Sequence, residues 1–520
     1  MDKKKVLEWC GKHENLLKAF VMMWLPLLCC MVTCALEGKT ISQVSLAASE
    51  WNDELFYYKQ VEGILSYGFP RGYFGFNESH ALKLSFAAWS PVLVFPWIVW
   101  GMIFGWNLMA PIYCNIFLMM LAVFLFVVLV KPNIKQLLML AVLLASFTPM
   151  TRFMLSGMPE VTCFAMVTVF LSLAVNYSRD RKDWKLAVMF LMIFLMTLMR
   201  PYLLIFIILP AYFWYCRKKL WGLAGTGVVL GVTGGVYVLI NHYLGAEYFT
   251  PLFDVTWIEK FFTEGILAGI KFTLYKLWDV GKVFAGMTIQ GFKTGYHAGT
   301  QFAGFLFMLV LLLQQAWQGF RKKNKPQLEL HLSLAVCFVG MLAAVLLMYK
   351  PIQGGRHLLT FIVAGIIMLC IMETRFYRKG IFGAALFVYL YMVMATDAYE
   401  HQVPYVQEDM QQTLAYWEDA LGQELVLDMA NTPCFDNVVI WTLSDEVEGV
   451  GENMKWQELY AVPEGFGISC CEKNFVEEHF NELQSKYLAV PFGGSLDERC
   501  QAEGMREIGH SEDVIIYELR

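Results

Sequence analysis

Two acidic residues, Asp53 and Glu54, stand together in an aromatic stretch of the chain just beyond its first long apolar segment. A carboxylate in such a place can take a proton from a hydroxyl group or hold a metal ion. Further along, Pro159 and Glu160 suit the first turn of a helix, where an acid also meets the positive end of the helix dipole. Each acid has a plainer interpretation, as a solvated loop acid for the pair and as a helix cap for Glu160.

A second set of residues supplies positive charge at the ends of apolar segments. Ionisable groups there are costly and are usually paired or functional, and cations of this kind can hold an anionic phosphate. The plainer alternatives are a snorkelling arginine at Arg200 and a packing histidine at His357. The candidates are Lys83, Arg152, Arg200, Arg356 and His357, with His80 in the loop that follows the acidic pair.

The composition indicates what must position these residues. The chain has 520 residues, of which 57% are hydrophobic and only 16% charged, and its mean hydropathy is +0.49. A soluble domain carries about a quarter charged residues. A single soluble core does not grow to hide this much apolar surface, whereas a bilayer does. The sequence therefore predicts a polytopic, all-α membrane domain.

We predict about eleven spans from the apolar segments, since roughly 20 apolar residues cross a bilayer as a helix. A short or re-entrant segment near Pro91–Pro96 precedes the second span. Basic clusters such as Arg321–Lys323 place the cytoplasmic loops, and this leaves the loops 37–85 and 244–298 outside. The predicted spans are 17–36, 108–130, 137–155, 159–177, 186–199, 201–216, 220–243, 299–318, 329–349, 356–372 and 380–397.

The C-terminal part differs in charge. Residues 1–399 hold 34 Lys and Arg against 20 Asp and Glu, whereas residues 400–520 hold 6 against 25. An acidic tail argues against nucleic-acid binding. We therefore divide the chain into a membrane domain, 1–399, and a small extracytoplasmic α/β domain, 400–520. The strands that we expect are 425–427, 438–441, 489–491 and 514–517, with a helix over 475–487. A disulfide is left open among Cys434, Cys470, Cys471 and Cys500.

Three features of the outer face form a common layout. They are the pattern Asp-Glu-x-x-x-Tyr at Asp53, Glu54 and Tyr58, the turn with Arg152, Ser156-Gly157 and Glu160, and the long outer loop 244–298 followed by a soluble C-terminal domain. In this layout the chain resembles the GT-C superfamily of membrane glycosyltransferases, which includes protein O-mannosyltransferases and aminoarabinose transferases.

The resemblance implies an inverting glycosyltransferase that takes a sugar from a polyprenyl-phosphate donor. The acceptor would be a lipid, a cell-wall polymer or a protein at the outer face of a plasma membrane, on the resemblance a bacterial one. Asp53 would be the general base, Glu54 would orient a substrate, and Glu160 would be a second polar or metal-binding acid. The cations named above would bind the lipid phosphate, and His80 would line the acceptor site. A divalent metal ion is left open.

Two other classes compete with this interpretation. A secondary transporter would show repeated halves and helices interrupted near the midplane, and the sequence has no two-fold pattern. A non-catalytic scaffold of envelope glycan assembly would need no acidic pair beside the arginines.

Overall fold

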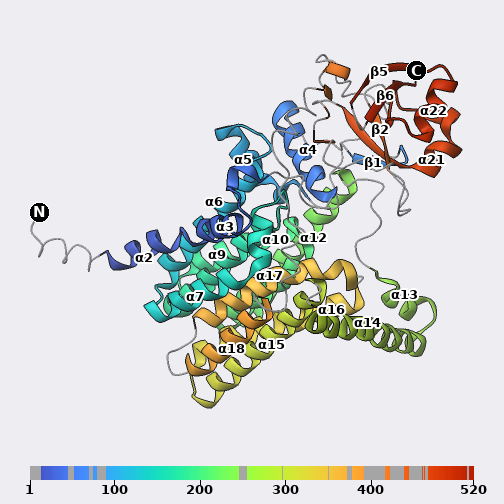
Figure 1. Ribbon diagram of the computed structural model, residues 1–520. Coiled ribbons are helices and arrows are strands. Elements are labelled where there is room, and N and C mark those ends of the chain that lie inside the picture. Colours follow the sequence, from blue (N-terminus) through green and yellow to red (C-terminus); the bar gives the residue numbers. More distant parts are fainter. Residues whose placement is uncertain are drawn as a thin grey trace, which may run out of the picture.

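The structure is a computed structural model in which most of the chain is helical (Figure 1). It describes residues 13–44, 52–68, 74–78, 90–244, 254–294, 297–348, 351–371, 377–391, 416–417, 419–421, 438–443, 459–460, 462, 466–511 and 514–519. Lys83, His80, Cys434 and the expected strand 425–427 lie outside these residues.

Six helical segments in this part of the chain are long and apolar enough to cross a membrane, and a bent pair makes a seventh. The chain is therefore a multi-pass membrane protein. The six are Glu14–Leu36, which joins α2 (Glu14–Met22) to α3 (Leu25–Leu36), then α6 (Ala110–Val130) and α9 (Glu160–Asp180), and most of α12 (Leu220–Leu244), α15 (His297–Arg321) and α16 (Lys325–Leu347).

The described parts of the remaining predicted spans are helical but shorter or broken, so the count of about eleven is not confirmed. Helix α7 (Ile134–Ser146) meets α8 (Thr148–Met154) at 68°. Proline explains several interruptions, because its ring disfavours a helical residue before it and removes a backbone donor. Arg200, which precedes Pro201, is extended at φ −148° and separates two helical stretches. The shorter elements are α10 (Asp183–Met199), η4 (Pro201–Ile207), α11 (Ile208–Lys218), α17 (Pro351–Cys370) and α18 (Tyr377–Tyr389).

The expected interruption before the second span is present as two short elements. The 3-10 helix η3 (Pro91–Leu93) leads into α5 (Phe95–Phe104), a helix of 10 residues. Gly105 ends α5 at φ +84°, a left-handed conformation that glycine adopts without strain. A helix of this length is too short to cross a bilayer.

The core of the helical bundle is built around α9 and α17. Phe164 and Phe170 of α9 are fully buried, and so is Phe361 of α17. Phe361 stacks on Phe206 with 4.7 Å between the ring centroids. Buried aromatic and aliphatic side chains of this kind fix how the helices pack, and thereby fix the helix ends from which the site residues project.

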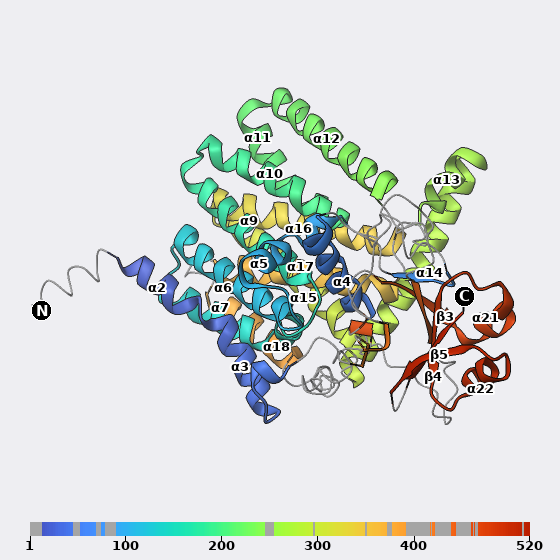
Figure 2. The same ribbon diagram turned by 90° about the horizontal axis from the view of Figure 1, so that it is seen from above.

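Two helices of the segment predicted as a long outer loop, 244–298, extend away from the bundle (Figures 1 and 2). They are α13 (Thr256–Thr263) and α14 (Ile266–Thr294), and Asp254 pairs with Lys276 at 2.5 Å beside them. Several of their large apolar side chains are exposed, including Phe262 and Leu267.

The described C-terminal residues form an α/β unit. Together with β1 they make a sheet that has six described strands, in the order β1-β3-β2-β4-β6-β5. The first four strands in this order are parallel, and β6 is antiparallel to both β4 and β5. The strands are β1 (Phe74–Phe76), β2 (Val438–Leu443), β3 (Gly467–Glu472), β4 (Tyr487–Pro491), β5 (Arg506–His510) and β6 (Val514–Glu518), with helices α21 (Lys473–Glu478) and α22 (Ser495–Ala502) beside them.

Three predicted strands, 438–441, 489–491 and 514–517, are confirmed within β2, β4 and β6. The helix expected over 475–487 is wrong in its second half. Helix α21 ends at Glu478, a 3-10 turn follows at Phe480–Glu482, and β4 begins at Tyr487. Cys470, Cys471 and Cys500 are free and buried thiols. The limits 1–399 and 400–520 remain a prediction.

The sequence did not indicate the sheet's edge strand. β1, drawn in blue among the red strands of Figure 2, comes from the loop that follows the acidic pair. It pairs in parallel with β3, so the membrane part and the C-terminal part share one sheet.

Candidate functional site

The acidic pair lies in the first turn of α4 (Asn52–Tyr67). Every residue from Glu54 to Gly63 is buried. Because α4 is covered on all sides over this stretch, its side chains are held in defined positions. Asp53, which precedes the buried stretch, keeps 40% of its side chain exposed.

A continuous chain of charged and polar contacts runs inward from Asp53. Arg356 Nη1 donates to Asp53 Oδ2 at 2.7 Å, and Arg356 Nε lies 3.5 Å from Glu160 Oε1. The same Glu160 oxygen accepts from Arg200 Nη2 at 2.5 Å, and that nitrogen lies 3.3 Å from the Tyr57 hydroxyl. The structure thus brings together four of the residues selected from the sequence, from segments far apart in the chain.

The burial of these groups is graded. Arg200 and Glu160 have side chains only 0% and 2% exposed, whereas Arg356 is 28% exposed. Two carboxylates and two guanidinium groups alternate, so the charges balance. A charge inside a protein is tolerated only when it is paired and hydrogen-bonded. Glu160 therefore acts as a bridge between two arginines, and Asp53 forms the open end of the chain.

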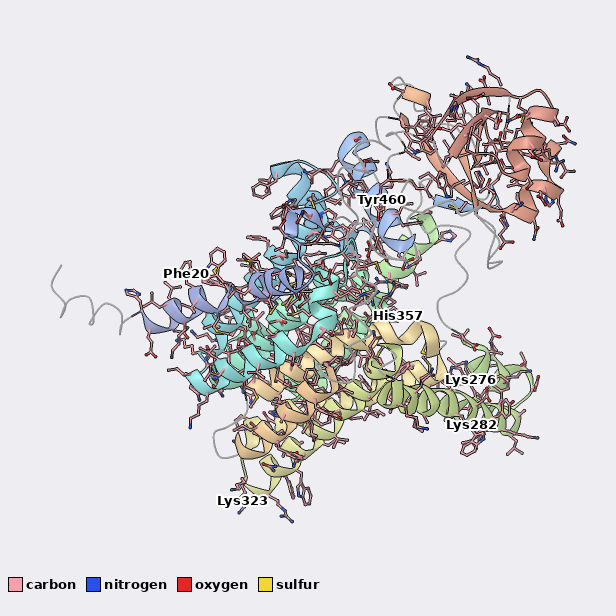
Figure 3. All side chains as sticks on the ribbon, viewed as in Figure 1. Phe20, Lys276, Lys282, Lys323, His357 and Tyr460 are labelled. Atoms are coloured by element: carbon pink, nitrogen blue, oxygen red, sulfur yellow. The ribbon has the colours of Figure 1, made fainter. Side chains whose placement is uncertain are left out.

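The other predicted site residues have different surroundings. Glu54 is fully buried, so it does not reach solvent in this structure. His357, which is labelled in Figure 3, is 4% exposed. Its ring lies 4.8 Å from that of Tyr202. Arg152 is half-buried in the last turn of α8. Lys83 and His80 lie outside the described residues, so their predicted roles stay predictions.

Tyr57 is a site residue that the sequence reasoning did not select. Its hydroxyl lies beside Arg200, and burial raises the pKa of this phenol above its ordinary value. The phenol is therefore neutral and serves as a hydrogen-bonding partner. Positions four residues apart share one face of a helix, so the spacing from Asp53 to Tyr57 is a signal that could have found it.

Tyr58, the tyrosine of the sequence pattern, has another function in the fold. Its ring stacks on Trp106 at 5.2 Å and meets Tyr460 edge-on at 5.4 Å. Trp106 belongs to the helical part and Tyr460 to the C-terminal part, and Figure 3 shows Tyr460 between the bundle and the sheet. Tyr58 therefore joins the two parts.

Among the residues that the structure describes, no group of three His, Cys, Asp or Glu side chains is placed to hold a metal ion. Arginines, in contrast, contact both Asp53 and Glu160. This arrangement favours an anionic ligand at the open end of the site, since guanidinium groups bind phosphate and carboxylate oxygens well.

Comparisons with known proteins give a fold-level likeness. No family model matches the chain, and no curated protein matches it. It is similar to a solved oligosaccharyltransferase of Archaeoglobus fulgidus, tethered with an acceptor peptide containing the NVT sequon, at 12% identity over 93% of this chain and 70% of that one, with a TM-score of 0.48. It is also similar to ArnT from Cupriavidus metallidurans bound to undecaprenyl phosphate, at 9% identity over 96% and 98% of the two chains, with a TM-score of 0.49.

Both solved proteins are GT-C glycosyltransferases, the superfamily that the outer-loop motifs resemble. With identities this low and TM-scores below 0.5, we rest the function proposed below on the site residues.

Proposed function

We propose that this protein is a membrane glycosyltransferase that moves a sugar from a polyprenyl-phosphate donor to an acceptor hydroxyl or amine at the outer face of the membrane. One observation carries the proposal. A partly exposed carboxylate, Asp53, stands at the open end of a buried chain of two arginines and a glutamate. The chain places a proton acceptor directly beside a cation that suits a phosphate.

The reaction follows from these two neighbours. Asp53 takes the proton from the acceptor group as that group attacks the anomeric carbon of the sugar. The new bond forms on the face opposite the phosphate, and the carbon–oxygen bond to the phosphate breaks. Its electron pair leaves with the lipid phosphate, so the configuration is inverted. The phosphate departs as an anion, and Arg356 stabilises its charge.

The geometry also supports an order of events. Arg356 Nη1 donates to Asp53 Oδ2 at 2.7 Å. A lipid phosphate that binds Arg356 would compete with this contact and free the carboxylate oxygen to accept a proton. Binding of the donor would thus activate the base.

Glu160 and Arg200 act through Arg356. The Glu160 carboxylate holds the Arg356 side chain from within, and Arg200 donates to the same carboxylate oxygen, Oε1. We therefore assign Glu160 a positioning role in place of the catalytic or metal-binding role expected from the sequence. Glu54, Arg152 and His357 remain predicted substrate-site residues, together with His80 and Lys83.

The test is the variant Asp53→Asn in membranes supplied with a polyprenyl-phosphate sugar and a range of acceptors. Loss of a general base lowers the rate by about 10²–10⁴-fold. A matched control is Asp254→Asn. Asp254 is also a half-exposed acid paired with a cation, Lys276, but this pair lies beside α13 and α14 and outside the chain of site residues. We expect the control to keep its rate. Full transfer by Asp53→Asn would exclude Asp53 as the base.

A different result would favour the other classes. If membranes that contain the intact protein consume no lipid-linked sugar with any acceptor, the enzyme proposal fails. A transporter or a non-catalytic scaffold of envelope glycan assembly then becomes the better interpretation.

A further inference from the structure

The loop that follows the acidic pair is anchored in the C-terminal sheet. Phe74 to Phe76 pair with Ile468 to Cys470 in a parallel register, and the backbone N–H of Asn77 donates to the Cys470 carbonyl at 3.0 Å. The sheet thus obtains its edge strand from the segment that also carries α4.

Glu78 fastens this junction. One oxygen of its carboxylate, Oε1, accepts hydrogen bonds from the backbone N–H of Gln484 at 2.9 Å and of Ser485 at 2.7 Å, and from the Ser485 hydroxyl at 2.7 Å. Its own backbone N–H donates to the Ser469 hydroxyl at 2.8 Å. Hydrogen bonds to a charged group are about twice as strong as neutral ones, and here three meet at one oxygen.

The backbone of Glu78 indicates that this contact is costly to form. Its φ is +58° and that of Asn77 is +48°. A glutamate in the left-handed region is unusual, because its Cβ comes too close to the backbone. Such a conformation persists only where the surroundings fix it, and the carboxylate contacts supply that constraint.

A second attachment comes from α4 itself. Lys59 Nζ donates to the Val462 carbonyl at 2.6 Å and to Glu62 Oε2 at 2.8 Å, and its side chain is only 3% exposed. Next to it, Tyr58 packs between Trp106 and Tyr460. The C-terminal part therefore holds α4 directly as well as through β1, within two turns of Asp53.

We propose that Glu78 and Lys59 are positioning residues, through which the C-terminal sheet holds α4 in place and keeps Asp53 beside Arg356. The catalytic part of this inference rests on the function proposed above. The mechanical part, that Glu78 stabilises α4 from a distance, does not depend on it.

The experiment compares Glu78→Gln with Glu78→Asp in the full-length protein in lipid nanodiscs. Hydrogen–deuterium exchange is followed in peptides that cover 483–486 and 52–67. Loss of a hydrogen bond to a charged group makes the exchange of the affected backbone amides about tenfold faster. For Glu78→Gln, we expect this faster exchange in both peptides, together with a fall in kcat at nearly unchanged KM for the acceptor. Glu78→Asp keeps the charge, so it should restore part of the protection from exchange and part of kcat.

The control is Glu518→Gln, which weakens ion pairs to Lys486 and Arg506 within the sheet but touches neither β1 nor α4. It should leave exchange in 52–67 unchanged. The proposal is overturned if Glu78→Gln accelerates exchange only at 483–486, or if Glu518→Gln accelerates 52–67 equally, because either result means that Glu78 only stabilises the C-terminal part. If neither the wild type nor any variant transfers sugar, the proposed function fails. The exchange result still decides whether Glu78 stabilises α4.

Discussion

At the scale of single residues, the site is defined by how its charges are paired. Arg200 and Glu160 are fully enclosed, so each depends on the other for the compensation that water would otherwise give. Their alternation with Arg356 and Asp53 leaves the outermost carboxylate partly exposed. The proposed base is therefore the least buried member of the set, and the two innermost members, Glu160 and Arg200, hold Arg356 beside it.

This pairing predicts a double-mutant result. Glu160→Gln leaves two arginines facing each other without their bridge, and breaking a buried pair costs about 3–5 kcal/mol. We expect a clear fall in the Tm of the purified protein. Glu160→Gln combined with Arg200→Met should be less destabilising than the sum of the two single changes, because neither charge is then left alone. Glu14→Gln, which alters the exposed pair with Lys18, is the control and should hardly change Tm. Additive effects at Glu160 and Arg200 would contradict the pairing.

The sequence indicated which residue types belong to the site, but it did not indicate how deeply each side chain is buried or what it contacts. Acids and arginines at the outer ends of apolar segments are conspicuous, and Asp53, Glu160, Arg200 and Arg356 were selected for that reason. Which carboxylate is exposed depends on packing between segments that are distant in the chain. The burial of Glu54 and the contact of Tyr57 with Arg200 could therefore not be predicted.

At the scale of elements, helix length and close packing decide the architecture. The apolar segments of the sequence predicted where the helices lie, because hydropathy directly reflects the free energy of transferring side chains into the bilayer. Proline breaks reduced the number of helices that can span it. The strand β1 was unpredictable, since three residues carry little periodicity and its partner, β3, lies in the C-terminal part.

Two glycines of α14 allow a test of this packing. A Cβ on Gly291 would overlap the backbone of Gly299 in α15, whereas one on Gly281 would meet nothing within 4 Å. Gly291→Ala should therefore force α14 away from α15 and destabilise the protein by about 1–3 kcal/mol. Gly281→Ala should be neutral or stabilising by up to about 1 kcal/mol, because alanine favours a helix. Thermal unfolding in the same detergent compares the two, and equal effects would show that α14 and α15 do not pack as described.

At the scale of the whole molecule, the basic residues and the position of the site favour the same orientation of the protein in the membrane. Lys323, from a basic cluster that we assign to the cytoplasm, lies at the end of the bundle away from the C-terminal sheet (Figure 3). The site residues, by contrast, connect to that sheet through α4 and β1. A donor that presents its phosphate at the outer leaflet would therefore meet the side of the molecule that carries Asp53.

This orientation is testable with single cysteines. Among the described cysteines, Cys216 is exposed beside the basic residues Arg217 and Lys218, and Cys10 and Cys434 lie outside the described residues, so the background variant replaces all three with serine. In this background, Ser495→Cys in α22 should react with a membrane-impermeant maleimide added to intact cells, because Ser495 is exposed on the part that we place outside. Lys323→Cys should react only after the cells are opened. Positive charge favours the cytoplasmic side, and this predicts opposite accessibilities for the two sites. Labelling of Lys323→Cys but not Ser495→Cys in intact cells would invert the topology and place the site on the cytoplasmic face, where the proposed outer-face reaction could not occur.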